Sequence, residues 1–130
     1  FDVEHTGCTD CYILQLSWGL YDLNGLLLRM NDYFVKPDTY MYINPYVSKI
    51  TGSMLTIAET GKRLNIKELQ TRFTADVMHC KALVAHNMAS DIKTINKELD
   101  RNGFTTLTAN TICTMSTTKR FCNLKTKLED

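Results

Sequence analysis

Apolar and polar residues alternate through the first third of the chain, and this alternation predicts strands. Within residues 12–21 every second side chain is apolar, as in a strand with one buried face: Leu14, Leu16, Trp18 and Leu20. Residues 22–25 are polar and end in Asn-Gly, which favours a hairpin turn. Residues 26–36 then predict the antiparallel partner strand, and Asp2 to Glu4 predict a short strand before both.

Two later segments carry apolar residues at helical spacing. Asn65 and Glu68 resemble a capping box, and apolar residues then recur every three or four positions: Ile66, Leu69, Phe73 and Val77. This pattern predicts a helix that ends near His79. A second helix, which Gly103 is placed to end, is predicted by Ile92, Ile95 and Leu99.

Short apolar segments lie beside these helices. Residues 82–85 are apolar throughout and too few for a helix, which favours a buried central strand. Residues 112–115 predict another short strand, followed by a helix over residues 116–122. Strands that alternate with helices are usually joined in parallel. The sequence therefore predicts an α/β domain whose mixed sheet starts with three antiparallel strands, continues with parallel strands, and is flanked by helices.

Length and composition fit one globular domain over residues 1–130, with 44% apolar residues for a core. Fifteen Lys and Arg face 14 Asp and Glu, a net charge of +1. This balance excludes a generally cationic surface, so any contact with nucleic acid would use a local groove. No apolar segment approaches membrane-spanning length, and we expect no membrane association.

The cysteines indicate a reducing compartment. There are five, an odd number, scattered along the chain, which argues against a disulfide framework and for a cytoplasmic, intracellular protein. Cys8 and Cys11 have the spacing of half a zinc site or of a redox pair. Because no second Cys or His pair at matching spacing follows, we interpret them as part of a variable loop between two strands.

Three acidic residues are candidates for metal binding. Asp2 and Glu4 are two residues apart in the first strand, so both carboxylates project from one face. Such a pair normally needs a cation or a proton, although an edge strand with two solvated acids is the alternative. Asp91 follows the strand at residues 82–85, at the sheet edge where open α/β sheets bind ligands. Hard carboxylate ligands favour Mg²⁺ or Mn²⁺.

Two stretches together resemble the DnaQ-like (DEDD) 3′–5′ exonucleases. The first motif of that family reads roughly F-D-x-E-T-T-G, and the matching residues here are Phe1, Asp2, Glu4, Thr6 and Gly7. The second reads roughly V-x-H-N-A-x-F-D, and it matches Val84, His86, Asn87 and Asp91. The resemblance spans nearly the whole chain and implies a ribonuclease H-like fold.

The resemblance also implies a chemistry, the hydrolysis of phosphodiester bonds with two Mg²⁺ or Mn²⁺ ions about 4 Å apart. Asp2 would bridge the ions, Glu4 would help hold the ion on the nucleophile side, and Asp91 would anchor the other. Substrate contacts are expected from His5, Thr6, Gly7, Thr51, Gly52, His86 and Asn87. His86 and Asn87 have an alternative role as structural hydrogen-bonding residues at a strand end and a turn.

The sequence departs from the family pattern in two places. Thr51 stands where the family usually has the histidine of a His-Gly-Ile/Leu element. The third motif, H-x-x-x-x-D or Y-x-x-x-D, is absent because no His or Tyr follows His86. That motif supplies the fourth acid and the general base of the family. Since the chain also begins with Phe, we expect a fragment truncated at both ends, with poor activity by itself.

The resemblance leads us to expect a metal-dependent 3′–5′ exonuclease that acts on single-stranded DNA ends. Its role would be that of a proofreading subunit, with a DNA polymerase as a candidate partner. One alternative within the family is an exoribonuclease that acts on RNA ends. An alternative of a different class is a catalytically inactive domain that binds nucleic acid or a polymerase. The sequence does not choose between DNA and RNA.

Overall fold

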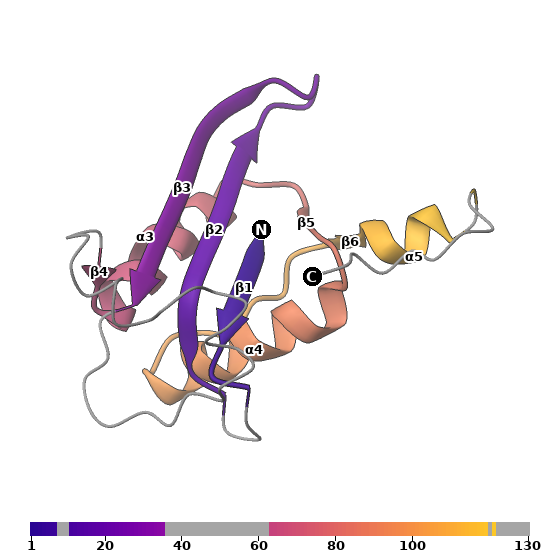
Figure 1. Ribbon diagram of the computed structural model, residues 1–130. Coiled ribbons are helices and arrows are strands. Elements are labelled where there is room, and N and C mark those ends of the chain that lie inside the picture. Colours follow the sequence, from indigo (N-terminus) through magenta and orange to yellow (C-terminus); the bar gives the residue numbers. More distant parts are fainter. Residues whose placement is uncertain (8–10, 36–62, 120, 122–130) are drawn as a thin grey trace.

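A computed structural model describes residues 1–7, 11–35, 63–119 and 121 (Figure 1). Cys8, Thr51 and Gly52, which the sequence analysis singled out, lie outside these residues. The elements in chain order are β1 (Asp2–His5), β2 (Ile13–Tyr21), β3 (Leu27–Val35), β4 (Arg63–Leu64), α3 (Ile66–Met78), β5 (Leu83–Ala85), α4 (Met88–Arg101), β6 (Thr111–Cys113) and α5 (Thr114–Thr118).

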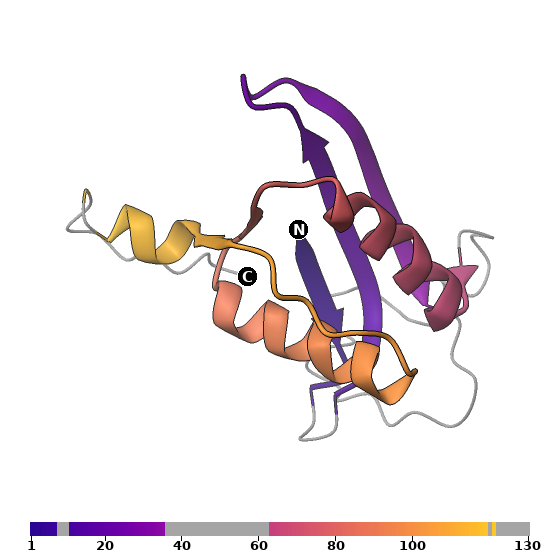
Figure 2. The same ribbon diagram turned by 180° about the vertical axis from the view of Figure 1, so that it is seen from behind.

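The described strands form two sheets. One has the order β1-β2-β3-β4, with antiparallel pairs except for the short parallel pair β3–β4. The other is the parallel pair β5–β6. Helices α3 and α4 lie on the same side of the larger sheet, as the two opposite views show (Figures 1 and 2). The predicted α/β class, with an antiparallel start and later parallel strands, is confirmed.

The predicted hairpin between β2 and β3 is confirmed. The Asp22 side chain accepts hydrogen bonds from the backbone N–H groups of Asn24 (2.8 Å) and Leu26 (2.9 Å), which fixes the turn. Gly25 adopts a φ of +85°, a conformation that costs glycine little. Asn24 keeps a negative φ, so only the second residue of the Asn-Gly pair uses the left-handed region.

The main core lies between the larger sheet and the two helices. Val3, Leu16 and Trp18 point from β1 and β2 toward the helices and are at least 94% buried. Phe73 of α3 contacts the Trp18 ring edge-on at 5.3 Å between ring centroids. Packing of this apolar strand face against α3 and α4 leaves the other face of the sheet for polar residues where β1 pairs with β2.

Both predicted helices are present, and their ends follow the sequence signals. Asn65 caps α3, because its Oδ1 accepts a hydrogen bond from the Glu68 N–H at 2.8 Å. The Glu68 carboxylate does not return this bond, since it pairs with Arg72 one turn later. Gly103 follows α4 with a φ of +78°, and the Phe104 N–H reaches the Leu99 carbonyl at 2.8 Å.

The C-terminal elements differ from the prediction. The strand covers Thr111–Cys113, because its pairing with β5 ends where Ala85 meets Cys113. The helix that follows begins two residues earlier than expected and covers Thr114–Thr118. Strand β4 was not predicted; its two residues pair with the end of β3. None of the described helices has the length and apolar character needed to cross a membrane.

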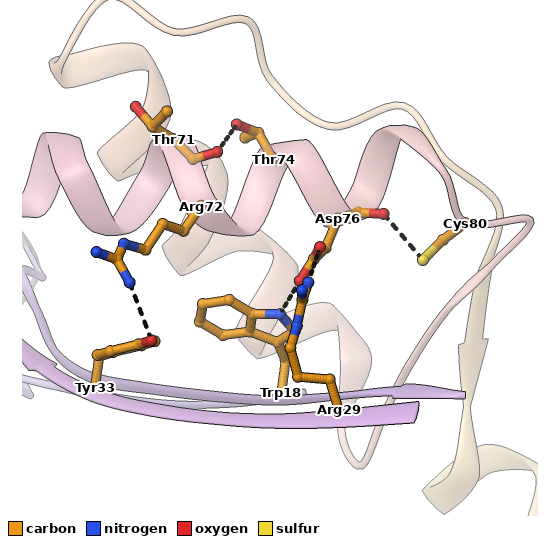
Figure 3. Close-up of polar contacts among 8 residues, drawn as sticks. All are labelled: Trp18, Arg29, Tyr33, Thr71, Arg72, Thr74, Asp76 and Cys80. Carbon is orange, nitrogen blue, oxygen red and sulfur yellow. Dashed lines mark hydrogen bonds and ion pairs between the residues drawn. The ribbon is translucent and has the colours of Figure 1, made fainter. Parts of the chain in front are cut away.

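Hydrogen bonds and an ion pair connect side chains of α3 to side chains of β2 and β3 (Figure 3). Asp76 accepts hydrogen bonds from the Trp18 indole N–H (2.8 Å) and from the Arg29 guanidinium. Burial acts to raise the pKa of Asp76, but the bonds from Arg29 and Trp18 hold it below the ordinary value. One turn earlier, Arg72 donates to the Tyr33 hydroxyl at 3.2 Å. These contacts fix the distance between helix and sheet.

We expect Asp76→Ala to lower the free energy of unfolding by about 2 kcal/mol, because the indole N–H of the buried Trp18 loses its acceptor. Asp76→Asn keeps an acceptor for Trp18 and removes only the ion pair to the half-exposed Arg29. It should cost under about 1 kcal/mol. Urea denaturation of the three proteins measures both effects. Equal losses in the two variants would contradict the expectation that the Trp18 hydrogen bond contributes more than the Arg29 ion pair.

Candidate active site

Strand β1 presents the two acidic residues on the face of the sheet opposite the helices. Val3 is buried in the core, whereas Asp2 is exposed and Glu4 is half-buried. Pairing with β2 sets Asp2 opposite Ser17 and Glu4 opposite Gln15, so four polar side chains share this face. Ser17 and Gln15 both donate to Asp32 of β3, at 2.6 and 2.9 Å. The carboxylates of β1 therefore lie at the end of a polar row that crosses three strands.

The described residues that follow β1 are hydrogen-bonded to one another and to Tyr12. A bulge separates Glu4 from His5, and Thr6 is completely buried. The Thr6 N–H donates to the Tyr12 carbonyl at 3.0 Å, and its hydroxyl accepts from the Tyr12 N–H at 3.1 Å. Gly7, with a φ of +77°, donates its N–H to His5 Nδ1 at 3.0 Å. Burial lowers the pKa of His5.

Substrate contacts were expected from three residues of this turn, His5, Thr6 and Gly7, and the hydrogen bonds of the turn limit which of them a ligand can reach. The Thr6 hydroxyl serves the turn, because the side chain is inaccessible to solvent. The ring of His5 is half-buried and bonded to the backbone of the same turn. The structure thus assigns Thr6 a structural role in shaping the turn, while the exposed Gly7 backbone is accessible to a ligand.

Glu98 connects this turn to α4. The Glu98 carboxyl is 3% exposed, and its Oε1 accepts from the Ile13 N–H at 2.9 Å. Arg101 pairs with the same oxygen at 3.1 Å, and Asn102 donates to Oε2 at 3.1 Å. Arg101 also reaches the Cys11 carbonyl at 3.2 Å. Sequence analysis missed Glu98, although its spacing of three residues from Ile95 places it at the edge of the apolar stripe.

Asp91 lies in the first turn of α4, close to the carboxylates of β1. Its side chain is 9% exposed, and its Oδ2 has no hydrogen-bond partner in the part of the chain that the structure describes. Burial raises the pKa of Asp91 to about 7, and the charges of Asp2 and Glu4 add to this effect. The amino group of Phe1 acts in the opposite direction. A buried carboxyl is thus brought beside two others without a compensating donor on Oδ2.

The residues between β5 and α4 have structural roles. Asn87 precedes α4 with φ +61° and ψ +48°, a left-handed conformation that Asn tolerates better than most residues. Its side chain forms no cap hydrogen bond, so the predicted bonding of the turn by this side chain is wrong. His86 Nδ1 lies 3.0 Å from the Thr114 hydroxyl and so connects the end of β5 to the start of α5.

Cys113 is a site residue that sequence analysis did not identify. Hydrogen bonds from Ser116 and from the backbone of Met88 and Asn87 lower the pKa of the Cys113 thiol to about 6. The thiol lies near enough to Asp91 to contribute to the raised pKa of that carboxyl. The signal available in the sequence was its position within the strand predicted at residues 112–115.

Three of the predicted residues lie near one another: Asp2, Glu4 and Asp91. The negative charges of Asp2 and Glu4 act on the Asp91 carboxyl and raise its pKa. Among the described residues, no group of three or more Asp, Glu, His or Cys side chains is arranged to hold a metal ion. All three groups are carboxylates, the ligand type that hard divalent cations prefer, and one oxygen of Asp91 is buried without a partner among the described residues.

No protein-family model matches the sequence, and no curated protein matches it significantly.

Proposed function

We propose that the chain is a metal-dependent 3′–5′ exonuclease domain that acts on single-stranded DNA ends. The observation that carries this proposal is the buried, unpartnered Asp91 carboxyl oxygen beside the acids of β1. Burying the Asp91 carboxylate near two further acids is costly unless a cation or a proton neutralises it. A divalent cation does so at neutral pH, and the two motifs that place these acids resemble those of DnaQ-like exonucleases.

We further propose that the two sheets act as one ribonuclease H-like sheet, with β1 and β5 as neighbours. The Phe1 amino group donates to the Val84 carbonyl at 2.8 Å, and this bond links the larger sheet to β5. The resulting order would be β4-β3-β2-β1-β5-β6, with β1 to β3 antiparallel and with parallel pairs at β3–β4 and β5–β6. It sets the end of β5, and hence the start of α4, next to Asp2.

In this site each residue of the chain has a defined task. Asp2, Glu4 and Asp91 would hold two Mg²⁺ or Mn²⁺ ions, which supply Lewis-acid stabilisation of charge on the phosphate when bound. The hydrogen-bonded turn at Thr6 and Gly7 would place its backbone next to the terminal nucleotide. The fourth acid and general base of the family's third motif have no counterpart in this sequence. We therefore expect cleavage by this chain alone to be weak.

Metal-linked stability tests the proposal without relying on activity. Mn²⁺ should raise the melting temperature of the chain, by an amount that grows with metal concentration, because it binds the folded state. Asp2→Ala and Asp91→Asn should each remove most of that gain. Asp100→Asn, at an exposed position on the same helix, is the matched control and should keep it. An equal gain in all four proteins would show that the metal binds elsewhere.

A catalytically inactive binding domain is the second candidate, favoured because no group of three or more Asp, Glu, His or Cys side chains among the described residues is arranged to hold a metal ion. Digestion and binding of end-labelled oligonucleotides distinguish the two. Mn²⁺-dependent shortening from the 3′ end that Asp2→Ala abolishes supports the enzyme, and the same assay with RNA tests the exoribonuclease alternative. Binding of single strands without shortening supports the inactive domain.

A further inference from the structure

The end of the β2–β3 hairpin carries a large apolar surface. Six side chains, here called the hairpin patch, are between 46% and 81% exposed: Tyr21, Leu23, Leu26, Leu27, Leu28 and Met30. The hairpin extends past the helices, which cover only the lower part of the two strands (Figures 1 and 2). Isolated exposed apolar residues are common, but six within ten residues are not.

Part of the hairpin patch is assembled on Gly19. A Cβ atom at this position would come within 2.8 Å of the Tyr21 ring and 3.3 Å of both Leu27 and Met30. The three side chains therefore lie over the bare backbone of Gly19, on the face of the sheet opposite the helices. They form a continuous apolar surface rather than separate side chains in solvent.

The neighbouring edge of β3 is only partly paired among the described strands. Among the described strands, β3 pairs with β2 along its length but with β4 only through Phe34 and Val35. The outer edge of residues 27–32 therefore has no strand partner in that part of the chain. An edge of this kind is a template for another strand unless charges or a bulge protect it. The pairing with β2 is irregular between Arg29 and Leu27, so the regular part of this edge is residues 29–32, and its charged side chains, Arg29 and Asp32, are engaged within the chain.

The charged groups of the hairpin are already engaged within the chain. Residues 19–31 contain one acid and one base, Asp22 and Arg29. Asp22 accepts from the backbone of its own turn, and Arg29 pairs with Asp76. No free cation is left to attract phosphates, which argues against nucleic acid on this surface. An apolar surface without free charge is complementary to a copy of itself.

The exposed area is also of the size that self-association needs. The six side chains expose on the order of 700 Å², against about 300–600 Å² for the largest patch of a typical monomer and about 800 Å² per partner in a standard interface. We propose that the hairpin patch and the adjoining edge of β3 form a two-fold interface with a second copy of this chain. Two β3 strands would then pair antiparallel across the axis.

This interface would leave the carboxylate site of each copy, formed by Asp2, Glu4 and Asp91, accessible. Strand β2 separates β3 from β1, so the edge used for pairing lies two strands away from Asp2 and Glu4. The inference is therefore independent of the proposed function, and its test does not require activity.

Analytical ultracentrifugation over a concentration series of the chain tests the proposal. We expect a reversible dimer with a roughly micromolar Kd. Met30→Lys and Leu28→Lys should each weaken it by about tenfold or more, because a charge on the pairing edge must be desolvated. Met78→Lys makes the same change as Met30→Lys at an 82% exposed methionine on α3, and it should leave the Kd unchanged. Circular dichroism checks that each variant is folded.

Hydrogen exchange at low and high protein concentration locates the contact. Amides of residues 27–32 should gain protection as the dimer forms. The proposal is overturned if the chain stays monomeric to about 500 µM, well above the expected Kd, or if Met78→Lys weakens the dimer as much as Met30→Lys. Open-ended aggregates in place of a dimer would also overturn it, because a two-fold contact closes on itself.

Discussion

Asp91→Asn should stabilise the metal-free protein, and the gain should grow as the pH rises. The folded-state pKa of Asp91 is raised to about 7, whereas an unfolded chain has the ordinary value of about 3.9. The folded state thus binds the proton more tightly than the unfolded state between these values. The contribution of Asp91 is most favourable below about pH 4, declines as the pH rises toward 7, and stays unfavourable above it.

Asparagine has nearly the same shape and carries no charge at any pH. The stability advantage of Asp91→Asn over the parent should therefore increase by roughly 2–3 kcal/mol between pH 5 and pH 8. Urea denaturation at both pH values, with a chelator present, measures this difference. Asp100→Asn on the exposed side of the same helix should show no such increase. Parallel pH profiles for the parent and Asp91→Asn would mean that Asp91 is not a strained, buried acid.

Glu98→Ala should have the largest effect on stability in the described part of the chain. The Glu98 carboxylate serves three donors at once, namely the Ile13 N–H, Arg101 and Asn102. Removing it leaves the buried Ile13 N–H without an acceptor and Arg101 without its partner. The loss should be about 3–5 kcal/mol, a large part of the 5–15 kcal/mol that stabilises a typical domain.

Two further variants separate the causes of this loss. Glu98→Gln keeps an acceptor oxygen for Ile13 and removes the charge, so it should cost less than Glu98→Ala. Glu68→Ala removes the acid of a half-exposed ion pair on α3 and should cost under about 1 kcal/mol. Chemical denaturation of all four proteins measures the differences. If Glu98→Ala costs no more than Glu68→Ala, the contacts of Glu98 do not stabilise the fold.

The two predictions concern opposite uses of a buried acid on the same helix. Glu98 is buried at the C-terminal end of α4 with a donor for each oxygen, and it stabilises the turn that follows β1. Asp91 is buried at the N-terminal end, where its neighbours are acids and its Oδ2 has no partner among the described residues. A residue that destabilises the fold in this way is typical of a functional site.

The sequence by itself determined the local elements and which face each residue occupies. Alternation in residues 12–21 predicted β2, helical spacing predicted α3 and α4, and Asn65 and Gly103 marked helix ends correctly. The two-residue spacing of Asp2 and Glu4 likewise placed both acids on one face of β1. These features follow from the repeat of the backbone, which neighbouring residues encode without any distant contact.

Only the tertiary structure decided what each face meets. Asp91 and Glu98 are both acids on an amphipathic helix, and no local pattern states that one gains three donors while the other gains two carboxylates. The pKa of the Cys113 thiol is lowered first by the nearby Ser116, but the backbone of Met88 and Asn87, distant in sequence, adds to this effect. Burial and charge interactions are properties of the packed chain, because they depend on which groups from distant segments lie within a few ångströms and on how much water remains between them.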